Sequence, residues 1–253
     1  MSPTDNAFDK FNDALKLDPA EKRRAEERHT TITEQLRLLG LVVTGFLQGS
    51  LARKTMIKPL RDVDKVLILS KAMAIHHVAN GAHVVAAIMV EAIRKLYPEA
   101  EVEIKRHAVT LDFGKNTFCF DMVFAYEFDD GTGDVDIMDT KSGGWKRSNT
   151  RSLIRVVEDR NKTSEGTFVP LVRELKFLVR DKLEIDLPGL HVESLAYALI
   201  LGQCRFSSGV TKVLTDASSL LRSGVRNRFR VVSGSGWFSE PFTYLIRCLI
   251  LEH

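Results

Sequence analysis

A change of pattern along the chain does most to limit its possible folds: strand-like segments fill the middle of the 253 residues, and helical patterns alone follow Trp145. Segments 41–47 and 63–69 are short runs rich in β-branched residues, and a long helical pattern occupies 78–96. Residues 102–126 contain two stretches that alternate with a period of two, as the strands of a meander do. This order predicts an α+β fold, in which a strand-containing lobe is followed by a helical lobe.

Helical patterns also precede the strands. Phe8 and Phe11 lie at helical spacing, and a charged helix begins after Asp18-Pro19 and ends at Gly40. Further helices are expected over 149–162, 165–182, 189–203 and 209–222. The expected parts are N-terminal helices that brace both lobes (1–39), an α+β core (40–145) and a helical lobe (146–253).

The composition excludes several classes of protein. With 36 Lys and Arg against 33 Asp and Glu, the net charge is +3, which is too small for a protein that coats nucleic acid. No apolar run is long enough for a membrane span, and the N-terminus lacks the pattern of a secretory signal. Cys119, Cys204 and Cys248 form neither a disulfide framework nor a metal motif, which favours a reducing cytoplasm. Residues 251–253 resemble the beginning of a vector-encoded histidine tag.

Charge is distributed unevenly along the chain. Residues 99–139 carry eleven acidic and three basic side chains, whereas residues 141–182 carry eleven basic and five acidic ones. An acidic region facing a basic one is what a cleft for metal and polyphosphate requires. Solvated surfaces of opposite sign explain the same pattern equally well.

A Gly-Ser step follows the first predicted strand. Gln48-Gly49-Ser50 leads into a short turn of helix, where glycine lets the backbone approach a ligand and free N–H groups favour an anion such as phosphate. The Ser50 hydroxyl adds a donor. Arg53 and Lys54 follow at positions from which they can meet further phosphate charge.

Two carboxylates begin the next strand. Asp62 and Asp64 are two residues apart, so a strand projects both from one face, where their repulsion is relieved best by a divalent cation. Oxygen ligands beside a phosphate site favour Mg²⁺ or Mn²⁺ over zinc. In the alternative interpretation, Asp62 caps a turn and only Asp64 lies at the surface.

Together these residues resemble the DNA polymerase β-type nucleotidyltransferase superfamily, whose third carboxylate lies on a neighbouring strand and matches Asp121 here. Within it, the chain resembles the cGAS/DncV-like nucleotidyltransferases (CD-NTases), which make cyclic oligonucleotide signals in anti-phage defence. The similarity covers residues 8–205, and the tail after residue 223 matches nothing. It is carried by FDKFNDALKL, the block from Gln48 to Asp64, FDMV, Trp145 with SNT, and VPLVRELKFLVRD. Phe124 and Thr150 depart from it, since the family commonly has proline at both positions.

The resemblance implies a polymerase β-like core, with a mixed sheet and helices, and a helical lobe. It implies that the three aspartates hold two metal ions, Mg²⁺ or Mn²⁺, and that Gly49 and Ser50 cradle the donor phosphates. Lys176 would reach the triphosphate from the helical lobe as a mobile charge. The implied reaction joins ATP, GTP, UTP or CTP into a cyclic oligonucleotide with release of pyrophosphate, and a downstream effector senses the product.

Two other functions remain open. A superfamily member could transfer nucleotides to RNA or to a protein, although minimal enzymes of that type carry only the Asp-x-Asp pair. A catalytically silent nucleotide or RNA sensor is the second, and the three intact aspartates argue against it. Activation by nucleic acid has no support in the sequence, and no membrane partner is expected.

Several further motifs favour structural explanations. Adjacent His76-His77 point apart on a helix, and the acidic segment 129–136 fails the calcium-loop spacing, so we expect a solvated turn there. Segment 141–144 lacks the Walker A order and is expected to be a flexible crossing between lobes. Trp145 is expected to pack at the lobe junction rather than line a base pocket. Arg222, Arg226, Arg228 and Arg230 form a basic cluster, and such clusters are more often solvated than bound to nucleic acid.

Overall fold

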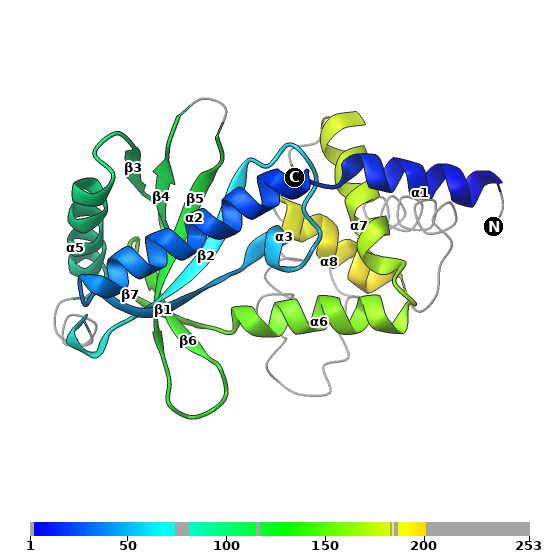
Figure 1. Ribbon diagram of the computed structural model, residues 1–253. Coiled ribbons are helices and arrows are strands. Elements are labelled where there is room, and N and C mark those ends of the chain that lie inside the picture. Colours follow the sequence, from blue (N-terminus) through cyan, green and yellow to red (C-terminus); the bar gives the residue numbers. More distant parts are fainter. Residues whose placement is uncertain (1–2, 74–80, 115–116, 183, 185–186, 201–253) are drawn as a thin grey trace. The chain divides into compact units, whose positions relative to one another are not determined.

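The computed structural model is shown in Figure 1, and it divides the chain into two compact units. One unit is Leu17–Arg155, and the other combines Met1–Lys16 with Val156–His253. The structure describes residues 3–73, 81–114, 117–182, 184 and 187–200.

The first unit is built on a seven-stranded mixed sheet. Its strands are β1 (Val42–Leu47), β2 (Asp62–Leu69), β3 (Glu101–Ile104), β4 (Val109–Asp112), β5 (Cys119–Glu127), β6 (Val135–Asp139) and β7 (Gly144–Ser148). Its helices are α2 (Pro19–Leu38), α3 (Gly49–Ala52) and α5 (Gly81–Leu96). The strand order is β1-β2-β5-β4-β3, and β6 pairs with both β5 and β7. β2 and β5 run parallel, and the other pairs among the described strands are antiparallel.

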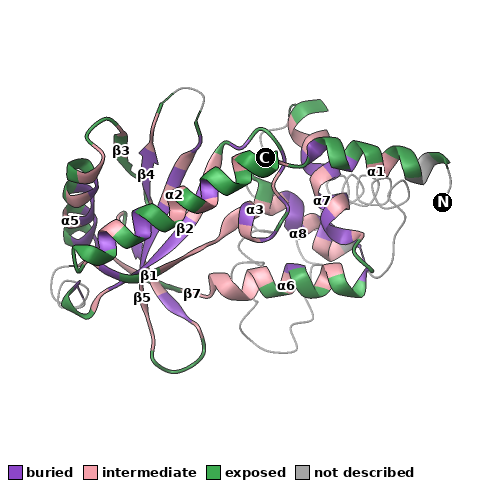
Figure 2. Ribbon diagram, viewed as in Figure 1, coloured by how far each residue is buried: buried purple, intermediate pink, exposed green. Residues whose placement is uncertain are grey.

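The two faces of the sheet have different coverings. On β2, Val63 and Leu67 belong to the main core, to which α2 and α5 also contribute. Val66 and Ile68 point the other way, because side chains alternate along a strand, and they join a smaller cluster with Val123, Ala125 and Val135. Figure 2 shows α2 with a buried stripe and a largely exposed outer surface, as expected for a helix that covers one face.

A buried lysine ties α2 to β2. Lys65 is fully buried, and its Nζ donates to the His29 carbonyl oxygen and to Thr33 Oγ1, both at 3.0 Å. Burial lowers the pKa of Lys65 to about 7. Burial and the Lys65 charge together lower the pKa of His29 to about 4. The face of β2 opposite Asp62 and Asp64 is therefore fixed to α2 by polar contacts as well as by apolar packing.

The second unit is helical. It contains α1 (Pro3–Leu15), most of α6 (Thr150–Thr163), α7 (Phe168–Phe177), the π-helical turn η1 (Leu178–Lys182) and α8 (Gly189–Leu199). Its core takes side chains from α6, α7 and α8, among them Val157, Leu171, Val172 and Ala196. α1 packs on α7, where the rings of Phe11 and Phe177 meet edge to face with centroids 5.1 Å apart.

Glu174 is an unusual member of this helical unit. It is buried on α7, and neither carboxylate oxygen has a hydrogen-bond partner in the described part of the chain. Burial and the nearby charge of Asp9 raise the pKa of Glu174 to about 8. Its carboxyl is therefore largely protonated at neutral pH, which avoids an unpaired buried charge.

The mixed α+β class predicted from the sequence is confirmed, but some elements differ. α7 begins at Phe168 rather than 165, because Ser164 Oγ and Asn161 Oδ1 accept from the first N–H groups of the helix, those of Phe168 and Val169. Residues 209–222 lie outside the described residues, as do His76-His77 and the later arginines. The role of residues 1–39 as a brace for both lobes stays a prediction.

The β6–β7 hairpin was missed by the sequence patterns. β6 begins at Val135, so the solvated turn expected over 129–136 ends earlier. The expectation that 141–144 is a flexible crossing is wrong, because this segment closes the hairpin and the Lys141 and Ser142 amides donate to Asp139 Oδ1. Trp145, on β7, is partly buried against the main core. Among the helices that the structure describes, none has the length and hydrophobicity needed to cross a membrane.

Candidate active site

The parallel pair β2–β5 collects the predicted aspartates on one face of the sheet. In register, Asp62 lies opposite Cys119 and Asp64 opposite Asp121. All three aspartates point away from the main core, on the face that carries Val66 and Val123 further along the strands. Because Asp62 is paired within β2, the alternative in which it caps a turn is wrong.

Gly49 lies directly against Asp64. An ideal Cβ placed on Gly49 would stand 1.7 Å from Asp64 Oδ2, and Gly49 has a φ of +68°. The neighbouring Gln48 N–H donates to the Asp64 carbonyl oxygen at 2.9 Å. Position 49 thus needs glycine for two reasons, the left-handed backbone and the closeness of the carboxylate. This brings the Gly-Ser step and the Asp-x-Asp pair together.

The rest of the Gly-Ser segment forms a compact turn beside β2. The Ser50 carbonyl oxygen accepts from the N–H groups of Thr55 and Met56 at 2.9 and 3.2 Å, so the chain folds back over α3. Arg53 is buried and Lys54 exposed, so of the two basic side chains Lys54 is the one open to solvent. Contact of Ser50, Arg53 or Lys54 with phosphate stays a prediction.

Asp121 has two side-chain partners that the sequence patterns did not indicate. Thr110, opposite Asp121 on β4, donates its hydroxyl to Oδ1. Lys105 Nζ lies 3.1 Å from Oδ1 and 3.4 Å from Oδ2. Partial burial lowers the pKa of Lys105, but the hydrogen bond and charge of Asp121 outweigh it and raise this pKa above its usual value. The β4–β5 register would have indicated Thr110, had strand pairing been known.

The donor set of this face suits a hard divalent cation. Asp62, Asp64 and Asp121 offer oxygen ligands, which Mg²⁺ and Mn²⁺ prefer, and the Lys105 ammonium already holds a cationic charge against Asp121. Within the described residues, however, no three acidic, thiol or imidazole side chains are grouped closely enough for a metal ion as they stand. The three aspartates offer suitable ligand atoms and lie on one face of the sheet. A metal ion that binds Asp121 would have to replace Lys105 as the partner of its carboxylate.

Lys176 differs from its expected setting. Its side chain is only 9% exposed, and its Nζ lies 2.6 Å from Oε1 of the equally buried Glu193, which α8 supplies. In the structure Lys176 is therefore held in a buried ion pair, whereas the resemblance implied a mobile charge. Contact of Lys176 with a triphosphate remains a prediction.

The mixed sheet and its helices form a polymerase β-like nucleotidyltransferase fold, in which the three aspartates share one face of the sheet and the Gly-Ser turn lies against Asp64. The model of the Second Messenger Oligonucleotide or Dinucleotide Synthetase domain (SMODS) matches residues 1–161, and the chain belongs to this family. No curated protein sequence gives a significant match.

Solved CD-NTase structures share the fold. The Bradyrhizobium diazoefficiens CD-NTase CdnG in complex with GTP has a TM-score of 0.68 at 12% identity, covering 98% of this chain and 90% of the other. A STING-associated CdnE c-di-GMP synthase from Capnocytophaga granulosa has a TM-score of 0.66 at 18% identity, covering 93% and 80%. E. coli MS115-1 CdnC, in complex with HORMA-deltaN, has a TM-score of 0.65 at 17% identity, covering 88% and 71%. The resemblance and the polymerase β-like fold inferred from the sequence are confirmed.

We expect Gly49→Ala to displace the Asp64 carboxylate and lower product formation by about 100-fold, since small displacements of reacting groups have effects of this size. The matched control is Gly131→Ala, because Gly131 has a φ of +73° but no atom within 4 Å of an added Cβ. Both variants should lose about 1–2 kcal/mol of stability from the left-handed backbone. Equal turnover in the two variants, measured with labelled nucleotides, would show that the closeness of Asp64 is unimportant.

We expect Lys176→Met to destabilise the protein by about 3–5 kcal/mol, because it removes the ammonium that pairs with the buried Glu193 carboxylate. The double variant Lys176→Met/Glu193→Gln removes both charges and should recover much of the lost melting temperature. Thermal unfolding followed by circular dichroism measures both. A single variant as stable as the wild type would contradict the importance of the pair.

Proposed function

We propose that the protein joins ribonucleoside triphosphates into a cyclic oligonucleotide, with release of pyrophosphate, as a signal in bacterial anti-phage defence (CBASS). The observation that carries this proposal is the SMODS match over residues 1–161 on a chain whose three aspartates share one sheet face. The expected cytoplasmic location, based on the cysteine content, belongs to the same proposal.

In this proposal each part of the first unit has a distinct task. Asp62, Asp64 and Asp121 would hold Mg²⁺ or Mn²⁺, and a metal bound there would lower the pKa of the acceptor hydroxyl and neutralise charge on the triphosphate. Gly49 keeps the backbone close to the Asp64 carboxylate, and Ser50 donates toward the donor phosphates. The aspartates, fixed by their strands, orient the two reacting ends, which is the main protein contribution to phosphoryl transfer.

Three solved relatives support the proposed class of substrate by analogy. CdnG was solved with GTP, the Capnocytophaga enzyme is a c-di-GMP synthase, and CdnC forms a complex with HORMA-deltaN. By analogy we propose ATP, GTP, UTP or CTP as substrates of this chain. An effector that senses the cyclic product is its proposed downstream partner.

We expect Asp62→Asn and Asp64→Asn each to lower product formation by about 100-fold or more while the fold stays intact. Removing one of two neighbouring carboxylates relieves their repulsion, so the melting temperature of the metal-free protein should stay equal or rise. Asp129→Asn, on the exposed β5–β6 loop, is the control and should leave turnover unchanged. Normal turnover in either site variant would contradict the metal assignment.

The product itself tests the cyclising step. If both ends of the linear intermediate stay bound, the free hydroxyl attacks its own 5′-triphosphate, and this step is effectively unimolecular. The protein is incubated with single and mixed labelled nucleotides and Mg²⁺ or Mn²⁺, and the product is then treated with phosphatase. We expect the labelled product to resist this treatment. A product that shifts on chromatography after phosphatase is linear. Label found only on added RNA or on a protein would favour the rival transferase, and nucleotide binding without any product would favour the silent sensor.

A further inference from the structure

Lys105 contacts the carboxylate of Asp121, the third aspartate of the site. Lys105 Nζ is within 3.4 Å of both carboxylate oxygens of Asp121, and the two side chains are 44% and 22% exposed. Thr110 donates to Oδ1 of the same carboxylate. The oxygen atoms that would face a cation are thus already bound to an ammonium and a hydroxyl.

The backbone that carries Lys105 is held firmly in place. The Lys105 N–H donates to the Ala108 carbonyl oxygen at 2.8 Å, which closes the β3–β4 turn. Arg106, next to Lys105, binds Asp139 through two parallel contacts of 3.0 and 2.8 Å. The Arg106 guanidinium and the Lys141 and Ser142 amides keep the pKa of Asp139 well below its usual range, so the pair stays charged.

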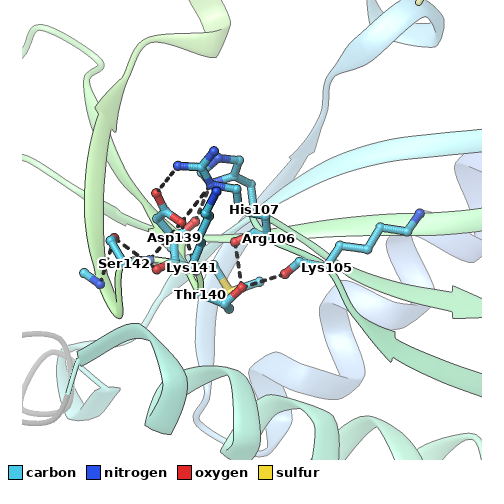
Figure 3. Close-up of polar contacts among 9 residues, drawn as sticks. Lys105, Arg106, His107, Asp139, Thr140, Lys141 and Ser142 are labelled. Atoms are coloured by element: carbon cyan, nitrogen blue, oxygen red, sulfur yellow. Dashed lines mark hydrogen bonds and ion pairs between the residues drawn. The ribbon is translucent and has the colours of Figure 1, made fainter.

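A third set of contacts joins the same turn to the β6–β7 hairpin. Thr140 donates its N–H to the Arg106 carbonyl oxygen at 2.9 Å and its hydroxyl to the Lys105 carbonyl oxygen at 3.1 Å. Figure 3 shows the Lys105 side chain extending away from the Arg106–Asp139 pair. The contacts of Arg106 and Thr140 therefore fix the backbone of Lys105 and leave its long side chain to reach Asp121.

We propose that Lys105 is the counter-ion of the metal-free site and competes with a divalent cation for the Asp121 carboxylate. The proposal rests on the metal site of the proposed function and adds a residue that limits the binding of metal there. An ammonium that shares both Asp121 oxygens relieves the repulsion among the three aspartates, and a divalent cation must displace it to bind there. Lys105 then lowers the affinity for metal and prevents the acidic face from holding stray cations.

The test measures the binding of Mn²⁺ alone, from the electron paramagnetic resonance signal of the free ion, to the full chain without nucleotide. We expect Lys105→Met to lower the Kd for Mn²⁺ about two- to fivefold, the range that a partly exposed ion pair supports. Lys105→Gln should act in the same direction. The matched control is Lys95→Met, which removes an equally charged lysine from an exposed pair with Glu91 and should leave the Kd unchanged.

Three further substitutions, Asp121→Asn, Asp64→Asn and Asp62→Asn, separate this proposal from the proposed function. In an Asp121→Asn background, Lys105→Met should no longer change the Kd, because its partner is gone. If Lys105→Met binds Mn²⁺ no more tightly than the wild type while Asp64→Asn binds it more weakly, the counter-ion role is wrong and the metal site stands. If Asp62→Asn and Asp64→Asn both bind Mn²⁺ as the wild type does, the metal site and the counter-ion role are both overturned.

Discussion

Parallel hydrogen bonding between β2 and β5 holds two carboxylates, Asp64 and Asp121, opposite each other on neighbouring strands. Two like charges in this position repel, and the sheet must offset that cost before any ligand arrives. Thr110 and Lys105 bind Asp121, while the backbone of Asp64 accepts from Gln48. On the opposite face both strands contribute apolar side chains to the main core, together with α2 and α5.

The opposite face of β2 combines apolar packing with a buried, hydrogen-bonded lysine. Val63 and Leu67 fill the main core, yet Lys65 between them is fully buried and bonded to α2. A buried ammonium is costly unless it is hydrogen-bonded, and the two α2 oxygens that accept from Lys65 are neutral, which agrees with its lowered pKa. The strand that presents the acidic face outward is therefore anchored inward by a specific polar contact.

Residues that act within one strand or turn could be predicted from the sequence. The period of two placed Asp62 and Asp64 on one face. The glycine before Ser50 was expected to let the backbone approach a ligand, and in the structure its close neighbour is the Asp64 carboxylate. Asp121 came from family resemblance, since nothing local distinguishes it. Contacts between residues on different elements were missed. Lys105, in the β3–β4 turn, pairs with Asp121 on β5, and Glu193 on α8 pairs with Lys176 on α7. β6 and β7 were missed because they are short and their charged residues do not alternate with apolar ones: Asp136 and Asp139 are three apart on β6, and Lys146 and Arg147 are adjacent on β7.

The separation of Asp64 and Asp121 along the chain has a consequence for how the protein is made. A parallel pair cannot be joined by a tight turn, and here α5, β3 and β4 all lie between its two strands. Such pairing has a high contact order, so a long loop must close before the hydrogen bonds between β2 and β5 add any stability. During synthesis, a nascent chain that already exposes Asp62 and Asp64 lacks their third carboxylate until β5 has left the ribosome and paired. The acidic face is completed late, after most of the first unit has been synthesised.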